Sequence, residues 1–228
     1  MTLIKEGETK KVFSTDSDKT VLIKFKDLLN NAESNEFVDL TTRINSYMFS
    51  KLAGIVSSQF VRSADFDSFF AKKVEMVPLT FFLHNFVAGS LAVRNSYNVG
   101  EWFPYPFLEY IITDEEKGKQ YVGEPEVVRQ EILNYSQIDV MVEFARKANQ
   151  ALWSDLRKKN LYLIDVKLKF GWDSDRNIIL ADEITPYNCR FWLRTNGGAL
   201  DFDIYRDNPT DPQKLLNSYR QIAEMLGC

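Results

Sequence analysis

Charged side chains alternate with apolar ones in the segment LYLIDVKLKF. Because successive side chains of a strand point to opposite faces, Asp165, Lys167 and Lys169 share one face. Asp182 and Glu183 follow at the end of the next apolar run. Lysine neutralises phosphate oxygens and aspartate holds the Mg²⁺ that bridges them, so this face has the composition of a nucleoside triphosphate site. A solvent-exposed face with cross-strand ion pairs is the alternative, and the alternation alone favours it.

Three other segments carry residues that could bind anions or move protons. The start of the chain, KEGETKK, could cover phosphates with backbone N–H groups and Lys10, although a charged chain start is the simpler interpretation. In NFVAGS, Ser90 could cap a helix and bind an anion with Arg94, and an ordinary helix start has the same pattern. His84 is the only histidine, and a lone histidine in an apolar run is more often a core residue.

The composition excludes several classes of protein. The 228 residues carry 28 Lys and Arg against 32 Asp and Glu, a formal net charge of −4, whereas non-specific nucleic-acid binding needs a basic surface. A hydrophobic content of 45% supports a packed core. The chain shows no apolar run typical of a membrane span or signal peptide, and two cysteines, Cys189 and Cys228, suit a reducing compartment. We therefore expect a cytoplasmic protein that binds neither nucleic acid nor membranes.

Apolar periodicity predicts the elements that must position these residues. Apolar residues spaced by four predict helices, and strict alternation predicts strands. A polar loop is expected over residues 26–36, and paired strands broken at Pro78 are expected over residues 69–86. The other predicted elements are strands 10–14 and 21–25, helix 38–52, helix 137–159, strands 161–170 and 178–181, and helix 211–226. This mixture of segregated strands and helices indicates an α+β fold.

Six segments, taken together and in order, resemble the SAICAR synthetase family, the phosphoribosylaminoimidazole-succinocarboxamide synthases of purine biosynthesis. The segments are EGETKKVF, KKVEMVPL, HNFVAGSLAVR, LIDVKLKFG, DEITPYNCRFW and DFDIYR, which span almost the whole chain. The resemblance implies a SAICAR-synthase-like α+β fold. It implies an N-terminal β-rich lobe over residues 1–78 and an ATP-grasp-like lobe over residues 79–228, packed as one compact unit.

The resemblance also implies an ATP-dependent carboxylate–amine ligase. Family members activate a carboxylate as an acyl phosphate with Mg²⁺ and ATP, and an amine such as aspartate then attacks it to form an amide. The positions implied for the nucleotide are Lys10, Lys11, Met76 and Lys167, with Asp182 as the metal ligand and Lys167, Lys169 and Asp182 at the reaction centre. The positions implied for the substrate are His84, Ser90, Arg94, Tyr187, Arg190, Asp203 and Arg206, and Asp201 lies in the same matching segment as the last two.

Several positions depart from the family pattern, and three of them bear most directly on metal and substrate binding. Lys169 stands where the family has a metal-binding glutamate, His84 where it has an arginine, and Tyr187 where it has an aspartate. A unit positive charge about 4 Å from a cation costs roughly 4 kcal/mol per unit of charge at an effective dielectric of about 20, so a second Mg²⁺ is not expected. Lys169 could instead replace that metal as a fixed charge. Replacing arginine by histidine removes bidentate phosphate recognition.

These departures favour a divergent ligase that uses another carboxylate and has been recruited to a specialised pathway. Two alternatives stay open. One is a genuine SAICAR synthetase, and the other is a catalytically degenerate homologue that binds a nucleotide or a partner. The presence of Lys167 and Asp182 argues against the degenerate homologue. Because family members often assemble into homo-oligomers, the resemblance extends that expectation to this chain.

Overall fold

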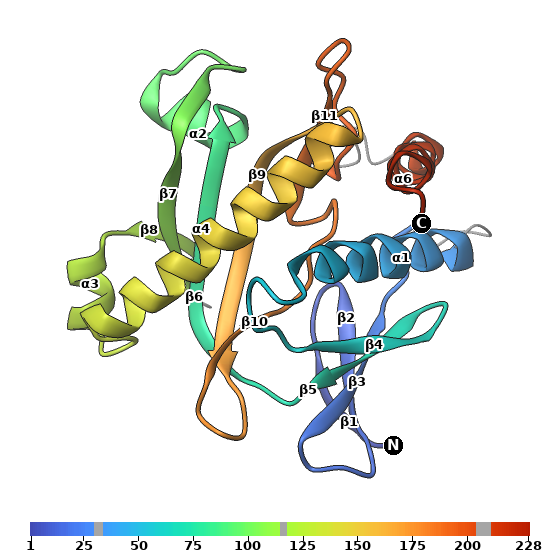
Figure 1. Cartoon of the computed structure of the whole chain (residues 1–228), viewed down its shortest axis with the longest axis vertical. Helices are drawn as coiled ribbons and strands as arrows, with labels where there is room; N and C mark the ends of the chain where they lie inside the picture. The colour runs from blue at the N-terminus through green and yellow to red at the C-terminus, as the bar shows by residue number, and fades with distance from the viewer. Residues whose placement is uncertain (30–33, 115–117, 204–210) are drawn as a thin grey trace.

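The computed structural model describes residues 1–29, 34–114, 118–203 and 211–228, and it contains two antiparallel sheets (Figure 1). The first sheet is built by the N-terminal part of the chain in the order β1-β2-β3-β5-β4. Its strands are β1 Leu3–Glu6, β2 Lys10–Ser14, β3 Thr20–Phe25, β4 Phe60–Asp65 and β5 Ser68–Lys72. The strands predicted at 10–14 and 21–25 are therefore confirmed.

The second sheet has the order β10-β9-β6-β7-β8, and β11 also pairs with β9. Its strands are β6 Glu75–Phe86, β7 Trp102–Asp114, β8 Gly118–Val122, β9 Leu161–Trp172, β10 Ile178–Ala181 and β11 Cys189–Leu193. β9 has β6 along one edge, and β10 and β11 share its other edge. The charged strand singled out in the sequence is thus central in its sheet.

The helices cover selected faces of the two sheets. They are α1 Ser34–Leu52, α2 Gly89–Asn95, α3 Glu124–Arg129, α4 Tyr135–Lys158 and α6 Pro212–Leu226. α4 packs across the second sheet against β9 and β6, and α1 contacts the first sheet, α4 and α6 (Figure 1). The face of β9 turned away from α4 is left for its charged side chains. None of the described helices has the length and apolar composition needed to cross a bilayer.

The start of α4 follows from a capping box. The Asn134 side chain accepts a hydrogen bond from the Gln137 backbone N–H at 2.9 Å, and the Gln137 side chain accepts one from the Asn134 N–H at 2.9 Å. This reciprocal pair satisfies two backbone donors that a helix start leaves unpaired, so the helix begins at Tyr135, slightly before the predicted 137. The predicted helices near 38–52 and 211–226 are also confirmed.

The predicted break at Pro78 is wrong. β6 runs through this residue, and the chain leaves the first sheet earlier, between Lys72 and Glu75. The pairing of β6 with β9 shifts register between Met76 and Thr80, and the pairing with β7 starts only at Thr80. Pro78 therefore lies in an irregular stretch where its missing N–H costs no ladder hydrogen bond.

Both sheets contribute to one apolar core. Val21 and Phe69 of the first sheet, Phe81 and Leu163 of the second, and Leu216 of α6 belong to the same buried cluster. The architecture is the mixed α+β fold that the sequence predicts. The division into lobes at residue 78 stays a prediction, since the first sheet ends at Lys72 and the second begins at Glu75.

Candidate active site

The charged face of β9 is enclosed at Asp165 and becomes more exposed towards Lys169, whose side chain is 43% exposed. Asp165 is only 1% exposed, and Lys167 is half-buried. The predicted alternative, a solvent-exposed face with cross-strand ion pairs, is wrong in its exposure at Asp165, but its cross-strand ion pairs are present, such as that of Arg190 with Asp165. A carboxylate is kept in such a place only when cations or donors compensate for its lost hydration. Two clusters of charge supply that compensation, one near the end of β9 at Lys169 and one near its start at Asp165.

The first cluster joins the two sheets through Asp182. Lys10 of β2 forms an ion pair with Asp182 Oδ1, and Lys169 of β9 approaches Asp182 Oδ2 at 2.7 Å. Burial raises the pKa of Asp182, but the two ammonium groups outweigh it and hold that pKa well below its usual range. The backbone of Asp182 is left-handed, with φ of 69°, and the Gln59 amide donates to its carbonyl at 2.7 Å. Strained conformations of this kind persist at functional sites.

Glu183 adds a second carboxylate to this cluster. Its Oε1 accepts a hydrogen bond from Thr9 at 2.9 Å, and its Oε2 lies 3.2 Å from Lys10 Nζ. Burial and the charge of Asp182 raise the pKa of Glu183, although Lys10 opposes them. The two lysines and two carboxylates of this cluster thus balance in charge. The cluster lies beside the loop between β1 and β2, whose backbone could cover phosphates.

The other predicted nucleotide residues take different positions. Lys11 follows Lys10 in β2 and pairs with Glu6 at 3.5 Å, so it does not join the Asp182 cluster. Met76 lies opposite Gly171 where the second sheet begins and is 39% exposed. Lys167 lies on β9 with its ammonium 4.9 Å from the centre of the Phe82 ring.

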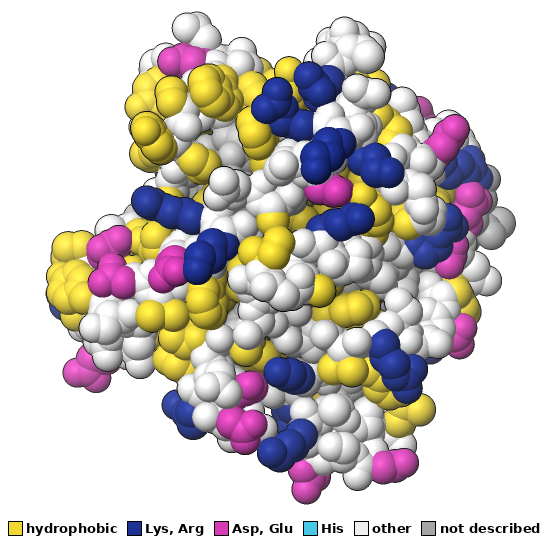
Figure 2. Space-filling model, viewed as in Figure 1, with side chains coloured by type: hydrophobic (Ala, Val, Ile, Leu, Met, Phe, Trp, Pro, Cys, Tyr) yellow, Lys and Arg dark blue, Asp and Glu magenta, His cyan; other side chains and the backbone are white. Residues whose placement is uncertain are grey.

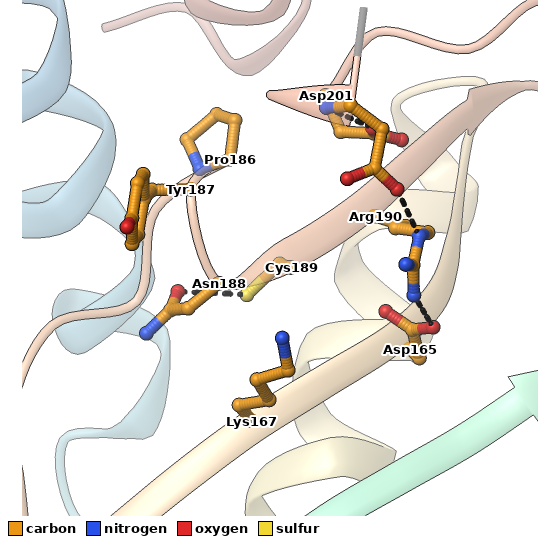
Figure 3. Close-up of a pocket in the computed structure, with 9 residues that line it drawn as sticks. Asp165, Lys167, Pro186, Tyr187, Asn188, Cys189, Arg190 and Asp201 are labelled. Atoms are coloured by element: carbon orange, nitrogen blue, oxygen red, sulfur yellow. Dashed lines mark hydrogen bonds and ion pairs between the residues drawn. The ribbon is translucent and has the colours of Figure 1, made fainter. Parts of the chain in front are cut away.

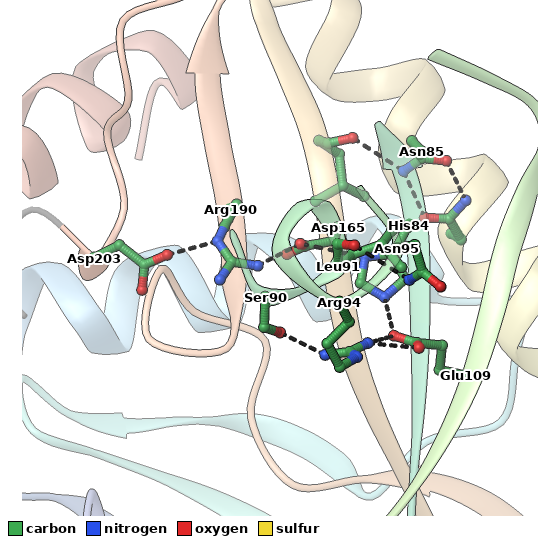
Figure 4. A network of polar contacts seen from close by, with 12 residues as sticks. His84, Asn85, Ser90, Leu91, Arg94, Asn95, Glu109, Asp165, Arg190 and Asp203 are labelled. Atoms are coloured by element: carbon green, nitrogen blue, oxygen red, sulfur yellow. Dashed lines mark hydrogen bonds and ion pairs between the residues drawn. The ribbon is translucent and has the colours of Figure 1, made fainter. Parts of the chain in front are cut away.

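The second cluster is centred on His84 of β6 (Figure 4). Its Nε2 lies 3.0 Å from Glu109 Oε2, and its Nδ1 lies 3.6 Å from Asp165 Oδ2. Arg94 donates two hydrogen bonds to Glu109, at 2.6 and 2.7 Å. Burial lowers the pKa of His84, but the two carboxylates outweigh it and raise the pKa above its ordinary value. His84 is buried, as expected of a core histidine, and it also belongs to a charged network.

Arg190 of β11 extends this network across β9 (Figure 4). Its guanidinium donates to Asp165 at 2.5 Å and to Asp203 at 2.6 Å. A Cβ atom at Gly89 would overlap the same guanidinium, at 2.9 Å from its Cζ, so the glycine that opens α2 makes room for Arg190. The structure therefore brings together five of the predicted substrate residues in one network: His84, Ser90, Arg94, Arg190 and Asp203.

A small polar cavity lies beside Arg190 (Figure 3). It holds about 10 Å³, room for one water-sized group. Tyr187 lies against Phe202 with ring centres 4.8 Å apart, and Lys167 reaches the cavity from β9. Carboxylates, a lysine and an arginine around one small space can bind and orient a polar substrate. The residues that line it are Asp165, Lys167, Pro186, Tyr187, Asn188, Cys189, Arg190, Asp201 and Asp203.

The interpretation of Ser90 needs a correction, and one site residue was not predicted. Ala88 is the N-cap of α2 and no side chain caps it, so Ser90 lies inside the helix and accepts a hydrogen bond from Arg94 at 2.8 Å. Arg206 lies outside the described residues. Glu109 was missed because β7 was not predicted; its signal is a single carboxylate within the apolar run PFLEYII.

Comparisons with known proteins agree with this geometry. The family model for SAICAR synthetase matches residues 3–224. The chain belongs to the SAICAR synthetase family. A phosphoribosylaminoimidazole-succinocarboxamide synthase of Listeria monocytogenes is 33% identical over 213 residues, covering 90% of each chain. One from Lysinibacillus sphaericus is 32% identical over 232 residues, covering 99% of this chain and 97% of the relative.

Solved structures of SAICAR synthetases share the fold. The enzyme from Ehrlichia chaffeensis superposes with a TM-score of 0.90 at 26% identity, over 99% of this chain and 98% of that one. A SAICAR synthetase in complex with ADP superposes with a TM-score of 0.88 at 28% identity, over 97% and 96% of the two chains. As a SAICAR synthetase family member, the chain is an ATP-dependent ligase that forms a C–N bond.

Proposed function

We propose that the chain makes SAICAR, by joining the carboxylate of carboxyaminoimidazole ribotide to aspartate with ATP. The observation that carries this proposal is the placement of both charge clusters on one strand, with the Asp182 cluster and its two lysines near one end of β9 and a small polar cavity nearer the other. The names of the relatives support this choice of substrates, since several are phosphoribosylaminoimidazole-succinocarboxamide synthases. This reaction was an alternative to the ligase of a specialised pathway that the sequence favoured.

The first cluster provides the chemistry for the nucleotide. Lys10 and Lys169 of this cluster, together with Lys167 on the same face of β9, would neutralise phosphate oxygens of ATP, a molecule whose diphosphate product is bound by a similar SAICAR synthetase. Fixed cations need no reorganisation as charge moves to the leaving phosphate, so they stabilise the transition state more than the ground state. Acyl phosphate formation then depends mainly on positioning and electrostatics.

One Mg²⁺ suits the donors of this cluster. Mg²⁺ commonly takes one or two carboxylates and completes its shell with phosphate oxygens and water. Asp182 offers one carboxylate, and the described residues contain no group of three side chains able to hold a metal ion. Asp182 would hold the ion and Glu183 would support it through Lys10. When bound, Mg²⁺ would neutralise the phosphates and orient them, while Lys169 supplies the charge of a second ion.

A second candidate function is a ligase for a different carboxylate. The observation in its favour is that the cations of the acceptor side are already paired, Arg94 with Glu109 and Arg190 with Asp165 and Asp203. A doubly charged ribotide phosphate would have to compete with these carboxylates. His84 and Tyr187, both departures from the family pattern, lie in the same region. A substrate without a phosphate would leave every pair intact.

The test combines calorimetry with complementation. ATP should bind the wild type in a Mg²⁺-dependent manner, and Asp182→Asn should weaken this binding by at least about tenfold, because one oxygen ligand and its charge are lost. Asp175→Asn, which changes an exposed aspartate that pairs with Lys19 at 3.4 Å, is the matched control and should bind normally.

A strain that lacks its own SAICAR synthetase separates the candidates. Growth without purines when this chain is expressed supports SAICAR synthesis. Mg²⁺-dependent ATP binding without growth supports the second candidate, to be followed by a screen of carboxylate and amine pairs for ADP release. ATP binding that ignores both Mg²⁺ and Asp182→Asn, or no binding, would contradict both ligase assignments and favour the degenerate homologue.

We also propose that the chain works in the cytoplasm as a homo-oligomer. An apolar tip supports self-association: Figure 2 shows hydrophobic side chains gathered over the end of the molecule where α2 and the start of β7 lie. These side chains are between 40% and 88% exposed. Their backbone includes Pro104 and Pro106, which cannot donate hydrogen bonds to an added strand, so contact would be through side chains. The apolar tip comprises Val93, Tyr97, Val99, Trp102, Tyr105 and Phe107.

A further inference from the structure

Asp201 is a buried carboxylate with an unused acceptor. It lies after β11, is 2% exposed, and lines the small cavity of Figure 3. Its Oδ1 accepts the backbone N–H of Asp203 at 3.0 Å. Its Oδ2 is buried and has no hydrogen-bond partner among the described residues. Since a buried carboxylate oxygen without a donor is costly, this geometry calls for a donor that enters the cavity from outside.

The groups around Asp201 suit it to exchange a proton. Burial and the negative charge of Asp203 raise the pKa of Asp201 to about 7, and Arg190 opposes this only in part. The guanidinium of Arg190 is shared between Asp165 and Asp203. A base is most effective when its pKa lies near the working pH. The ionisable side chains that line the cavity with Asp201 are Asp165, Lys167, Tyr187, Cys189, Arg190 and Asp203.

We propose that Asp201 is the general base that takes the proton from the attacking amine. This inference rests on the proposed ligase function. The amine nitrogen forms a C–N bond with the carbonyl carbon of the acyl phosphate, and the bond from that carbon to the phosphate oxygen breaks. The electron pair leaves with the phosphate, and one N–H proton moves to Asp201 Oδ2. The cavity has room for one water-sized group, which matches an amine nitrogen, and Lys167 lies in the same cavity to stabilise the oxyanion.

The test compares two amines in Asp201→Asn and in the wild type. With carboxyaminoimidazole ribotide and aspartate, Asp201→Asn should lower kcat by about 10²- to 10⁴-fold, the usual effect of losing a general base. Hydroxylamine is largely uncharged at neutral pH and reacts with acyl phosphates without a base. Hydroxamate formation and the accompanying ADP release should therefore stay within a few-fold of wild type in the variant.

A second measurement needs only the wild type. Its rate with aspartate should rise with pH through about 7, because the base must lose its proton. With hydroxylamine, the rate should not show this rise. Equal losses with both amines in Asp201→Asn, or the same rise with pH for both, would overturn the role of Asp201 while leaving the ligase function intact. A wild type that releases no ADP with either amine would contradict the proposed function, and this inference with it.

Discussion

Burial and neighbouring charges have opposite effects on the pKa of His84. It lies between Glu109 and Asp165, and burial alone would keep its imidazole neutral. The two carboxylates reverse that preference, and Glu109 in turn has its pKa lowered by His84 and Arg94 despite burial. A protonated His84 therefore holds two strands of the sheet, β7 and β9, to β6 by charge.

This arrangement predicts a specific pH dependence of stability. The pKa of His84 is raised above 6.5 in the folded protein, so its contribution is fully present below about pH 6.5 and is lost as pH rises through the folded pKa. The free energy of unfolding, measured with urea at several pH values, should fall more steeply above pH 6.5 in wild type than in His84→Gln. Parallel curves would show that His84 is neutral in the folded state.

Single residues of the site were predictable to different degrees. The resemblance predicts that Lys10 and Asp182 both belong to the nucleotide site, and their ion pair in the structure agrees with that prediction. Glu109 was not predictable, because it reaches His84 only through the pairing of β6 with β7, which places Phe82 opposite Glu109. That register depends on the whole sheet rather than on any local pattern.

At the scale of elements, β9 ends beside the connection from the first sheet to the second. Gly171 lies opposite Met76, and a Cβ atom there would overlap the Val74 side chain and lie 2.5 Å from the Glu75 carbonyl oxygen. The chain at the start of β6 thus lies beside β9 at a distance that only glycine permits. This close approach lies at the connection between the first sheet and the second.

Gly171→Ala should therefore destabilise the protein. The backbone cannot move away as a flexible side chain could, so we expect the free energy of unfolding to fall by about 1–3 kcal/mol. Gly7→Ala is the matched control, because a Cβ atom there would lie at an ordinary 3.6 Å from the Lys10 carbonyl oxygen. Urea unfolding of both variants checks this prediction, and equal stability of the two would contradict it.

Elements with regular patterns were the ones that the sequence predicted. Apolar and charged residues alternate strictly along β9, which forms a hairpin with β10, and the apolar residues of α4 recur at helical spacing. Both elements were therefore expected. β7 was not, because Pro104 and Pro106 interrupt its start with turn-like signals. In the structure they lie in a stretch where β7 leaves its ladder with β6, between Trp102 and Phe107.

At the scale of the whole molecule, the apolar tip is the most distinctive part of the surface. Between Asn95 and Leu108 the only charged residue is Glu101, in a chain with 26% charged residues. The four aromatic side chains of the tip leave on the order of 450 Å² uncovered. This is about the apolar area of one side of a standard protein interface. A second copy meeting it with the same surface would face little like-charge repulsion.

We expect the wild type to dimerise and Tyr105→Lys to weaken the dimer by about thirtyfold or more, because two buried ammonium groups would meet near one another. Phe66→Lys is the control, since Phe66 is also an exposed aromatic residue (45%, against 88% for Tyr105) and lies away from the tip, in the turn between β4 and β5; it should leave the dimer unchanged. Sedimentation equilibrium measures both. A monomeric wild type, or equal effects of the two substitutions, would show that the tip is not a self-association surface.

The ion pairs around Asp182 have a consequence for how the sequence can change over generations. Lys10, Lys169, Asp182 and Glu183 form a set with zero net charge that also fastens one sheet to the other. Replacing Lys169 by an acid would leave the set with an excess negative charge in a buried place, which only a further cation could offset. A substitution that changes the charge at one of these four positions should therefore be accompanied by a compensating substitution at another of them.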